Sequence, residues 1–203
     1  MFAELLRHDG VDEVVELRSP FGFLAFHGGS LEQSTDTIAS EAARRSGASL
    51  YAVIQPPDLR WHIPSRMVDP AQSPALRGFL EHVETVVAVH GYGRPGRWTD
   101  ILLGGRNRIL AARLGGRLAA ALPDYRVLAD LDDIPPELRG RHPDNPVNRP
   151  RGGGVQLELP PRVRGLGPVW AQWEGPGHPP PTEALIDALA AVAAEALADG
   201  LSG

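Results

Sequence analysis

The sequence predicts a single α/β domain in which a mixed β-sheet carries helices on both faces. Strand-like and helix-like segments alternate along most of the chain, which is typical of a layered α/β fold. The run TVVAV at 85–89 is apolar at every position but the first, as expected of a central strand covered on both faces. The 203 residues include no Cys, so a core rather than disulfides must stabilise them. We therefore expect residues 1–203 to form one domain.

The individual elements follow from hydrophobic periodicity and turn residues. The alternating segment 11–17 and the apolar run 22–26, separated by RSPF, predict two strands joined as a hairpin. A shorter strand is expected at 61–63, and Thr182 is expected to cap the last helix. The remaining expected strands are 49–54, 85–89, 100–105, 125–130 and 155–159, and the expected helices are 37–45, 73–83, 107–121 and about 182–199.

The charge balance excludes several function classes. All 20 basic residues are Arg, against 25 acidic residues, for a net charge of −5, which makes nucleic acid or an anionic membrane a poor partner. The lack of Lys also excludes Schiff-base chemistry and a P-loop. The first ten residues do not resemble a secretory signal, and no stretch is long enough to span a membrane. We therefore expect a cytoplasmic protein.

Two predicted strands end in a His-Gly sequence, at His27 and at His90. The loops beyond the carboxyl ends of strands line the ligand crevice of an open α/β sheet, so both imidazoles are expected there. Glu32, five residues after His27, can fold back beside the ring. Two His and one carboxylate with an open position form a catalytic zinc set, which predicts one Zn²⁺ per chain. The alternative is that each His is a turn residue and Glu32 a first-turn acid favoured by the helix dipole.

Two further polar groups lie late in the chain. In VQLEL, Gln156 and Glu158 share one face of the expected strand. This face either borders a polar site or meets water on a half-exposed strand, and the pattern alone favours water. The preceding loop contains Asn148 and Arg149, residue types that can bind a carboxylate but that also occur on solvated surfaces.

Several blocks together resemble the poly-gamma-glutamate hydrolase family, over roughly residues 20–165. The combination of HGG-x-x-E, a later HG and a GVQLEL strand is specific, whereas each block alone is weak. In this sequence the blocks are FHGGSLEQST at 26–35, SLYAVI at 49–54, WHIPS at 61–65, VVAVHG at 86–91, LLGG at 102–105 and NPVNRPRGGGVQLELP at 145–160, followed by Arg162.

The resemblance implies a fold similar to that of zinc carboxypeptidases and zinc-dependent cleavage of the γ-amide bonds of poly-γ-glutamate. It also implies a glutamyl-containing substrate. Residue by residue, it makes His27, Glu32 and His90 the metal ligands, Glu158 the general base, and Asn148 and Arg149 the groups that hold a substrate carboxylate.

The sequence also departs from the family pattern. Trp61 and Pro64 flank His62 and Ile63 in a block that usually reads L-H-I-T-S, and neither His62 nor Ser65 receives a role. Residues 166–203 have no counterpart in the family pattern. Two alternatives therefore stay open: a zinc amidohydrolase acting on a small γ-glutamyl or N-acyl compound, and a non-catalytic binding module on the same scaffold.

Overall fold

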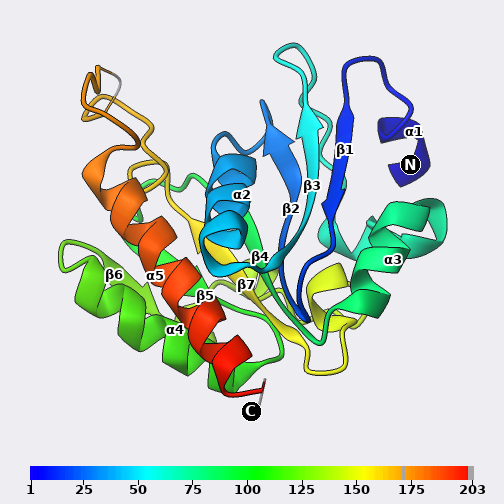
Figure 1. The fold of residues 1–203 in the computed structure, drawn as a ribbon. Helices are drawn as coiled ribbons and strands as arrows, with labels where there is room; N and C mark the ends of the chain where they lie inside the picture. The colour runs from blue at the N-terminus through cyan, green and yellow to red at the C-terminus, as the bar shows by residue number, and fades with distance from the viewer. Residues whose placement is uncertain (171, 201–203) are drawn as a thin grey trace.

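The computed structural model describes residues 1–170 and 172–200, and these form one mixed sheet with helices on both faces (Figure 1). The strands are β1 Asp12–Glu16, β2 Phe21–Gly29, β3 Ser49–Gln55, β4 Thr85–Gly91, β5 Asp100–Leu103, β6 Arg126–Leu128 and β7 Gly154–Leu159. The α-helices are α1 Phe2–Leu5, α2 Thr35–Ser46, α3 Pro74–His82, α4 Arg108–Ala121 and α5 Pro180–Ala198. Short 3₁₀ helices lie at Ser65–Met67, Pro70–Gln72, Leu131–Asp133, Pro136–Leu138 and Pro146–Asn148.

Each face of the sheet buries its own apolar core. Helices α2, α4 and α5 cover one face, where side chains such as Phe23, Val87 and Leu157 are buried. Helices α1 and α3 cover the other face, with Leu24, Ala88 and others beneath them. Alternate residues of a strand point to opposite faces, so each central strand supplies both cores. This confirms the predicted α/β class with helices on both faces.

The strand order β1-β3-β2-β4-β7-β5-β6 places β4 at the centre of the sheet, as the TVVAV run predicts. Strands β3, β2, β4 and β7 are mutually parallel. From β2 the chain runs through α2 to β3 on one side, and from β3 through α3 to β4 on the other side of β2. The direction in which the chain adds strands to the sheet therefore reverses between β2 and β4. In open α/β sheets, ligands bind beside the carboxyl ends of the strands at the position of this reversal.

The predicted hairpin of the first two strands is wrong. Strand β1 pairs antiparallel with β3, with Val14 opposite Ala52, while β2 lies between β3 and β4. The physical reason is burial. Every residue of Phe21–Gly28 is buried, so β2 needs a neighbour on each side, whereas β1 is partly exposed and suits the sheet edge.

Two other strand predictions also need correction. Residues 61–63 are not a strand, because the Gln55 side chain receives a hydrogen bond from Trp61 N and donates one to Trp61 O and so replaces a ladder partner. The polar face of β7 does not meet water. Gln156 and Glu158 are buried because β7 lies between β4 and β5 and the 131–153 loop packs over it, with Asn145 donating to Gln156.

The last helix begins earlier than expected, at Pro180, with Pro179 as its N-cap. Thr182 lies inside the first turn, where its hydroxyl donates to Val163 O at 2.9 Å and ties the helix to the segment that follows β7. None of the helices in the described part of the chain combines the length and the apolar character that crossing a membrane requires.

Candidate metal centre

Three neighbouring parallel strands bring polar side chains to one place at their carboxyl ends. His27 comes from β2, His90 from β4 and Glu158 from β7. His90 and Glu158 are register partners on adjacent strands, and the rings of His27 and His90 have centroids 5.0 Å apart. All three side chains are buried, and Phe26 packs edge-on against both imidazoles. The site therefore lies at the switch point of the strand order.

The loop after β2 returns Glu32 to this point. Gly29 adopts a φ of 71° and lies so close to Gln55 that a side chain would collide with its backbone. Glu32 N donates to His27 O at 3.0 Å, which closes the turn, and Asp36 accepts from Gly29 N at 3.0 Å. The chain therefore needs glycine here to double back.

The carboxylate of Glu32 lies between the two imidazoles. One oxygen is 2.9 Å from Nδ1 of His27, and the other is 3.3 Å from Nδ1 of His90. Ligand atoms of a tetrahedral zinc ion with bonds near 2.1 Å lie about 3.4 Å apart. Both distances from Glu32 to an imidazole nitrogen are thus close to this value.

The hydrogen bond of His27 to the backbone tests whether this set fits a cation. His27 Nε2 lies 2.8 Å from Ile63 O, and because a carbonyl only accepts, Nε2 must carry the proton. Nδ1 then faces the Glu32 carboxylate at 2.9 Å, a contact that requires either a proton on Nδ1 or a metal cation between the two acceptors. A metal-bound His typically donates its other nitrogen to a carbonyl in this way. The donor set therefore fits a metal ion.

Electrostatics keep the carboxylate of this set ionised. Burial opposes ionisation of Glu32, but attraction to His27 and His90 outweighs it and holds its pKa well below the usual range. For His90, burial opposes protonation, and the charges of Glu32 and Glu158 outweigh it and raise the imidazole pKa. His90 Nε2 is buried with no hydrogen-bond partner among the described residues. The cluster of His27, Glu32 and His90 therefore favours positive charge beside Glu32.

His62, to which the sequence assigns no role, lies at the open side of the same cluster. Its ring centroid is 4.9 Å from that of His27, and ligand atoms of His27, Glu32 and His62 all lie within 4.8 Å of one another. Unlike His90, His62 is exposed. The structure thus offers two imidazoles, His90 and His62, to complete a set begun by His27 and Glu32.

Glu158 occupies the floor of the site beside His90. Burial raises its pKa to about 7, even though His90 favours ionisation. One of its oxygens accepts from Gln156 Nε2 at 2.8 Å, and Gln156 Oε1 accepts from Asn145 at 2.7 Å. This relay of amides fixes the orientation of the carboxyl group. A carboxyl group with a pKa near 7 is suited to general base catalysis.

The two residues expected to hold a substrate carboxylate lie in different environments. Asn148 is buried, and its amide donates to Gly140 O and His142 O and accepts from Arg106 N, so no donor remains free. Arg149 is exposed and donates to Asp144 at 3.3 Å. Only Arg149 lines the groove of about 530 Å³ that also includes His62.

One buried cation of the site was missed by sequence reasoning. Arg164, in the segment after β7, is 7% exposed, and its guanidinium packs against Gly91 beside Glu32 and Glu158. The sequence contains 20 basic residues, all Arg, and nothing in the spacing of Arg164 distinguishes it from the others. Only its burial distinguishes Arg164.

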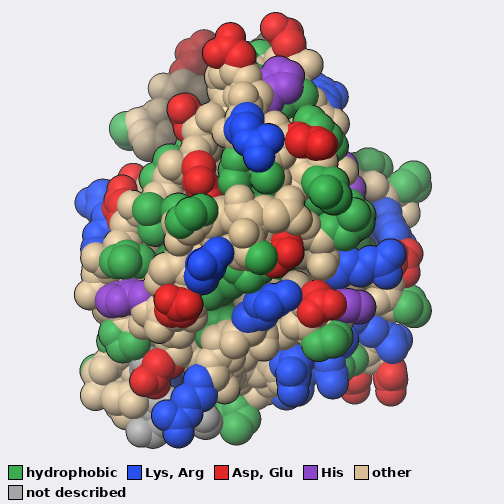
Figure 2. Space-filling model, turned by 90° about the vertical axis from the view of Figure 1, so that its right-hand side faces the viewer, with side chains coloured by type: hydrophobic (Ala, Val, Ile, Leu, Met, Phe, Trp, Pro, Cys, Tyr) green, Lys and Arg blue, Asp and Glu red, His purple; other side chains and the backbone are tan. Residues whose placement is uncertain are grey.

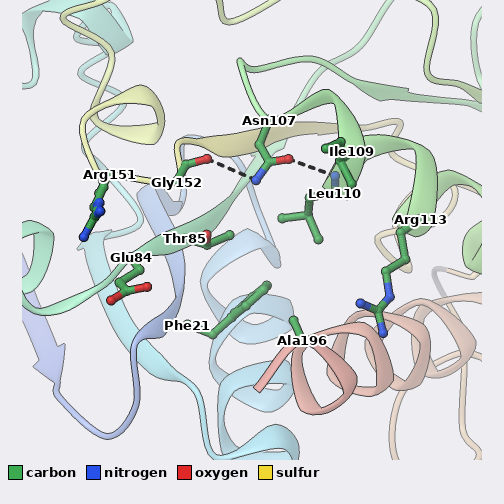
Figure 3. Close-up of a pocket in the computed structure, with 10 residues that line it drawn as sticks. All are labelled: Phe21, Glu84, Thr85, Asn107, Ile109, Leu110, Arg113, Arg151, Gly152 and Ala196. Atoms are coloured by element: carbon green, nitrogen blue, oxygen red, sulfur yellow. Dashed lines mark hydrogen bonds between the residues drawn. The ribbon is translucent and has the colours of Figure 1, made fainter. Parts of the chain in front are cut away.

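A second hollow, of about 290 Å³, lies at the opposite ends of the same strands (Figure 3). It is lined by Phe21 and Thr85, which begin β2 and β4, and by Asn107, whose side chain bridges Gly152 O and Leu110 N.

On the side of the molecule that carries β1, α1 and α3, basic and acidic side chains are interspersed with apolar ones (Figure 2).

Comparison with known protein families gives one match over most of the chain. The model of the poly-gamma-glutamate hydrolase family matches residues 3–166. Two relatives from Bacillus subtilis (strain 168) are the SPbeta prophage-derived UPF0714 protein YoqZ, 27% identical over 75% of this chain, and the UPF0714 protein YndL, 29% identical over 71%. The chain covers 58% and 54% of their lengths, so it spans little more than half of these relatives.

Solved structures share the fold. A bacteriophage poly-gamma-glutamate hydrolase superposes with a TM-score of 0.78 at 23% identity, covering 98% of this chain and 95% of the other. A zinc-free form of YndL gives 0.71 at 24% identity, covering 92% and 91%. A metallo-carboxypeptidase from Burkholderia cenocepacia gives 0.53 at 10% identity, covering 98% and 68%. The expected likeness to carboxypeptidase folds is therefore confirmed.

Proposed function

Since the chain belongs to the poly-gamma-glutamate hydrolase family, we propose that it is a metal-dependent hydrolase that cleaves γ-glutamyl amide bonds. The observation that carries the proposal is the convergence of His27 Nδ1 and His90 Nδ1 on the two oxygens of Glu32, with Glu158 opposite His90. A metal set and a separate carboxyl group of pKa about 7 are what hydrolysis of an unreactive amide requires.

We assign the metal to His27, Glu32 and His90, and we propose that it is zinc. Imidazole and carboxylate donors in a set of three suit catalytic zinc, which keeps one position open. When bound, zinc would polarise the scissile carbonyl and lower the pKa of a bound water to about 7. The Ile63 carbonyl would hold the His27 ring in the tautomer that leaves Nδ1 free for the metal.

Glu158 is the proposed general base. A carboxylate oxygen would take a proton from the attacking water and then deliver it to the nitrogen of the leaving amine, so that the proton is conserved over the cycle. Gln156 already donates to one oxygen of Glu158, and this hydrogen bond would hold the group in place during both transfers. Gln156 and Asn145 are thus positioning residues.

The substrate would approach along the groove that includes His62 and Arg149. Arg149 would attract carboxylates of a glutamate polymer there, in competition with its bond to Asp144. We assign Asn148 to bracing the loop that carries Arg149, because its amide groups already bond to the backbone.

The first experiment is metal analysis of the purified protein by elemental mass spectrometry, beside assays of poly-γ-glutamate chain length. We expect about one zinc per chain, and loss of both metal and cleavage in His27→Ala and His90→Ala. Absence of metal after incubation with zinc, together with no cleavage of the polymer, would overturn the proposal.

The same analysis distinguishes His90 from His62 as the third ligand. His90 is buried with Nδ1 3.3 Å from Glu32, so its loss should abolish binding. His62 is exposed, and His62→Ala should retain zinc with at most a modest loss of affinity. The opposite result would move the site to His27, Glu32 and His62.

A test of substrate size distinguishes the polymer from a small compound. The open groove favours an extended substrate, so the polymer should be cleaved with a higher kcat/KM than a γ-glutamyl dipeptide. A preference for the dipeptide or for an N-acyl compound would instead assign the chain to small-molecule hydrolysis.

A further inference from the structure

Arg164 is held rigidly at the edge of the site. Its Nε donates to Leu159 O at 3.2 Å and its Nη1 to Gln33 O at 2.6 Å, so the guanidinium joins the end of β7 to the loop that carries Glu32. Two of the five N–H groups of the guanidinium are used in this way. Nη2 has no hydrogen-bond partner among the described residues, so three N–H groups remain to bind an anion.

The charge of Arg164 is buried without direct compensation. The residue is 7% exposed, and within the described part of the chain it forms no ion pair with a carboxylate. Glu32 and Glu158 act on it only through longer-range attraction, against the burial that lowers its pKa. A buried charge without a carboxylate partner is costly, and an anionic ligand bound to the guanidinium would offset that cost.

The guanidinium also lies close to the metal set. Gly91 follows His90, and Gly91 N donates to Glu32 Oε2 at 2.9 Å. A Cβ atom added to Gly91 would lie 2.6 Å from Cζ of Arg164, so only glycine lets the guanidinium approach β4 at this point. A substrate group bound by Arg164 would therefore lie next to the scissile bond.

We propose that Arg164 binds a substrate α-carboxylate on one of the two residues that flank the scissile γ-amide, and that it thereby selects γ-linked glutamate. The inference rests on the proposed function. In a γ-linked chain every residue keeps a free α-carboxylate, whereas an α-linked peptide has an amide in its place. A fixed guanidinium that binds this carboxylate discriminates between the two linkages by charge.

The first arm of the test uses the unaltered, zinc-loaded protein. Substrates are a γ-glutamyl trimer and two analogues in which the α-carboxylate on one or the other side of the scissile bond is an α-carboxamide. A charge-assisted hydrogen bond in a buried site predicts that kcat/KM falls roughly ten- to hundredfold for one analogue. The analogue that suffers identifies which residue Arg164 contacts.

The second arm uses Arg164→Gln and Arg164→Lys. In Arg164→Gln the acid and the sensitive amide should be cleaved with equal, low kcat/KM, while zinc content stays unchanged. Arg164→Lys keeps the charge without the planar fork and should recover part of the preference for the acid. The matched control is Arg162→Gln, which removes an exposed Arg two residues away and should behave as the unaltered protein.

Two results would overturn the inference and leave the proposed function standing. One is equal cleavage of acid and both amides by the unaltered protein, which needs no variant to fold. The other is a loss in Arg164→Gln that is the same for all three substrates, which would indicate a structural role or a role in stabilising the oxyanion.

Calorimetric binding of glutarate separates the two proposals. If the unaltered protein cleaves no γ-glutamyl bond, the proposed function fails, and glutarate binding then decides the inference. Binding that is weakened roughly tenfold or more in Arg164→Gln would uphold Arg164 as a carboxylate site. No binding, or binding independent of Arg164, would overturn it.

Discussion

Charged side chains near the two ends of the parallel strands β2, β4 and β7 differ in burial. At the carboxyl ends, His90, Glu158 and Arg164 are buried. At the amino ends, Glu84 and Arg151 line the second hollow (Figure 3) and are exposed. Arg113, which also lines this hollow, pairs with Glu195 at the surface. A concavity lies near each end of these strands, but among these residues only those at the carboxyl ends carry charges that burial makes costly.

The difference indicates that buried charge is better evidence for a candidate catalytic site than a concavity alone. Surface ion pairs such as Arg113 with Glu195 contribute little and need no functional explanation. Buried groups with shifted pKa values concentrate at functional sites, because catalysis needs charge where water would otherwise neutralise its effect. Substitutions matched between the two ends therefore test the comparison directly.

The largest effect is expected from removing the proposed base. Glu158→Gln keeps the shape and the hydrogen bond from Gln156, but it cannot take a proton from water. We expect kcat to fall by roughly 10²- to 10⁴-fold with zinc content unchanged. The matched substitution at the other end is Glu84→Gln, which should leave kcat as it is. Near-normal turnover by Glu158→Gln would rule out Glu158 as the base.

The next effect is a pH dependence of stability in metal-free protein. The pKa of Glu158 is raised from 4.5 to about 7, so the folded state binds more protons than the unfolded state between these values. Its contribution to stability is therefore lost as pH rises through this window. The lowered pKa of Glu32 acts in the opposite sense, with stability lost as pH falls below 4.5.

Urea unfolding at pH 5 and pH 7.5 would measure this contribution. The unaltered protein should lose on the order of 2 kcal/mol more stability between the two pH values than Glu158→Gln, in which the group cannot titrate. The difference between the two proteins reports Glu158 together with His90, because the charge of Glu158 raises the pKa of His90. Identical pH dependence would mean that burial does not raise this pKa.

The sequence predicts the carboxyl-end site better than its surroundings. The His-Gly endings and the spacing to Glu32 are local patterns, and the rule that strand ends line the crevice is enough to bring His27 and His90 together. Pairing between distant strands is not local, and for this reason the sequence predicts a hairpin of the first two strands that the structure does not contain. Arg164 and His62 join the candidate site only through tertiary contacts: no spacing marks Arg164, and His62 lies in a family-like block that gives it no role.

The dependence on non-local contacts also explains why the sequence predicts that the polar face of β7 meets water. Alternation correctly placed Gln156 and Glu158 on one face, but it cannot reveal the loop that covers that face. The buried amides of Asn145 and Gln156 become meaningful only once their partners are known. Hydrophobic periodicity and turn residues predict where helices and strands lie, whereas the burial of a strand's polar face depends on the topology of the whole sheet.

A smaller effect is expected from crowding Arg164. Gly91→Ala places a Cβ within 2.6 Å of the Arg164 Cζ and must displace the guanidinium. We expect KM for γ-glutamyl substrates to rise about tenfold, with zinc retained. The control is Gly78→Ala in α3, where nothing lies within 4 Å; it should stabilise the protein by about 0.5–1 kcal/mol without changing KM. An unchanged KM in Gly91→Ala would show that the guanidinium does not contact substrate.

The smallest effect is expected at the amino-end hollow. Asn107 caps α4 by accepting from Leu110 N at 2.9 Å, and it donates to Gly152 O at 3.1 Å, just before β7 (Figure 3). Asn107→Ala should therefore lower the free energy of unfolding by about 1 kcal/mol, the usual cost of a lost cap.

Because β7 carries Glu158 at its far end, kcat of Asn107→Ala reports whether the cap also positions the proposed base. We expect kcat to stay unchanged, since the ladder between β4 and β7 fixes the strand independently of the cap. A fall in kcat beyond the loss of folded protein would mean that the two ends of the sheet are coupled through β7.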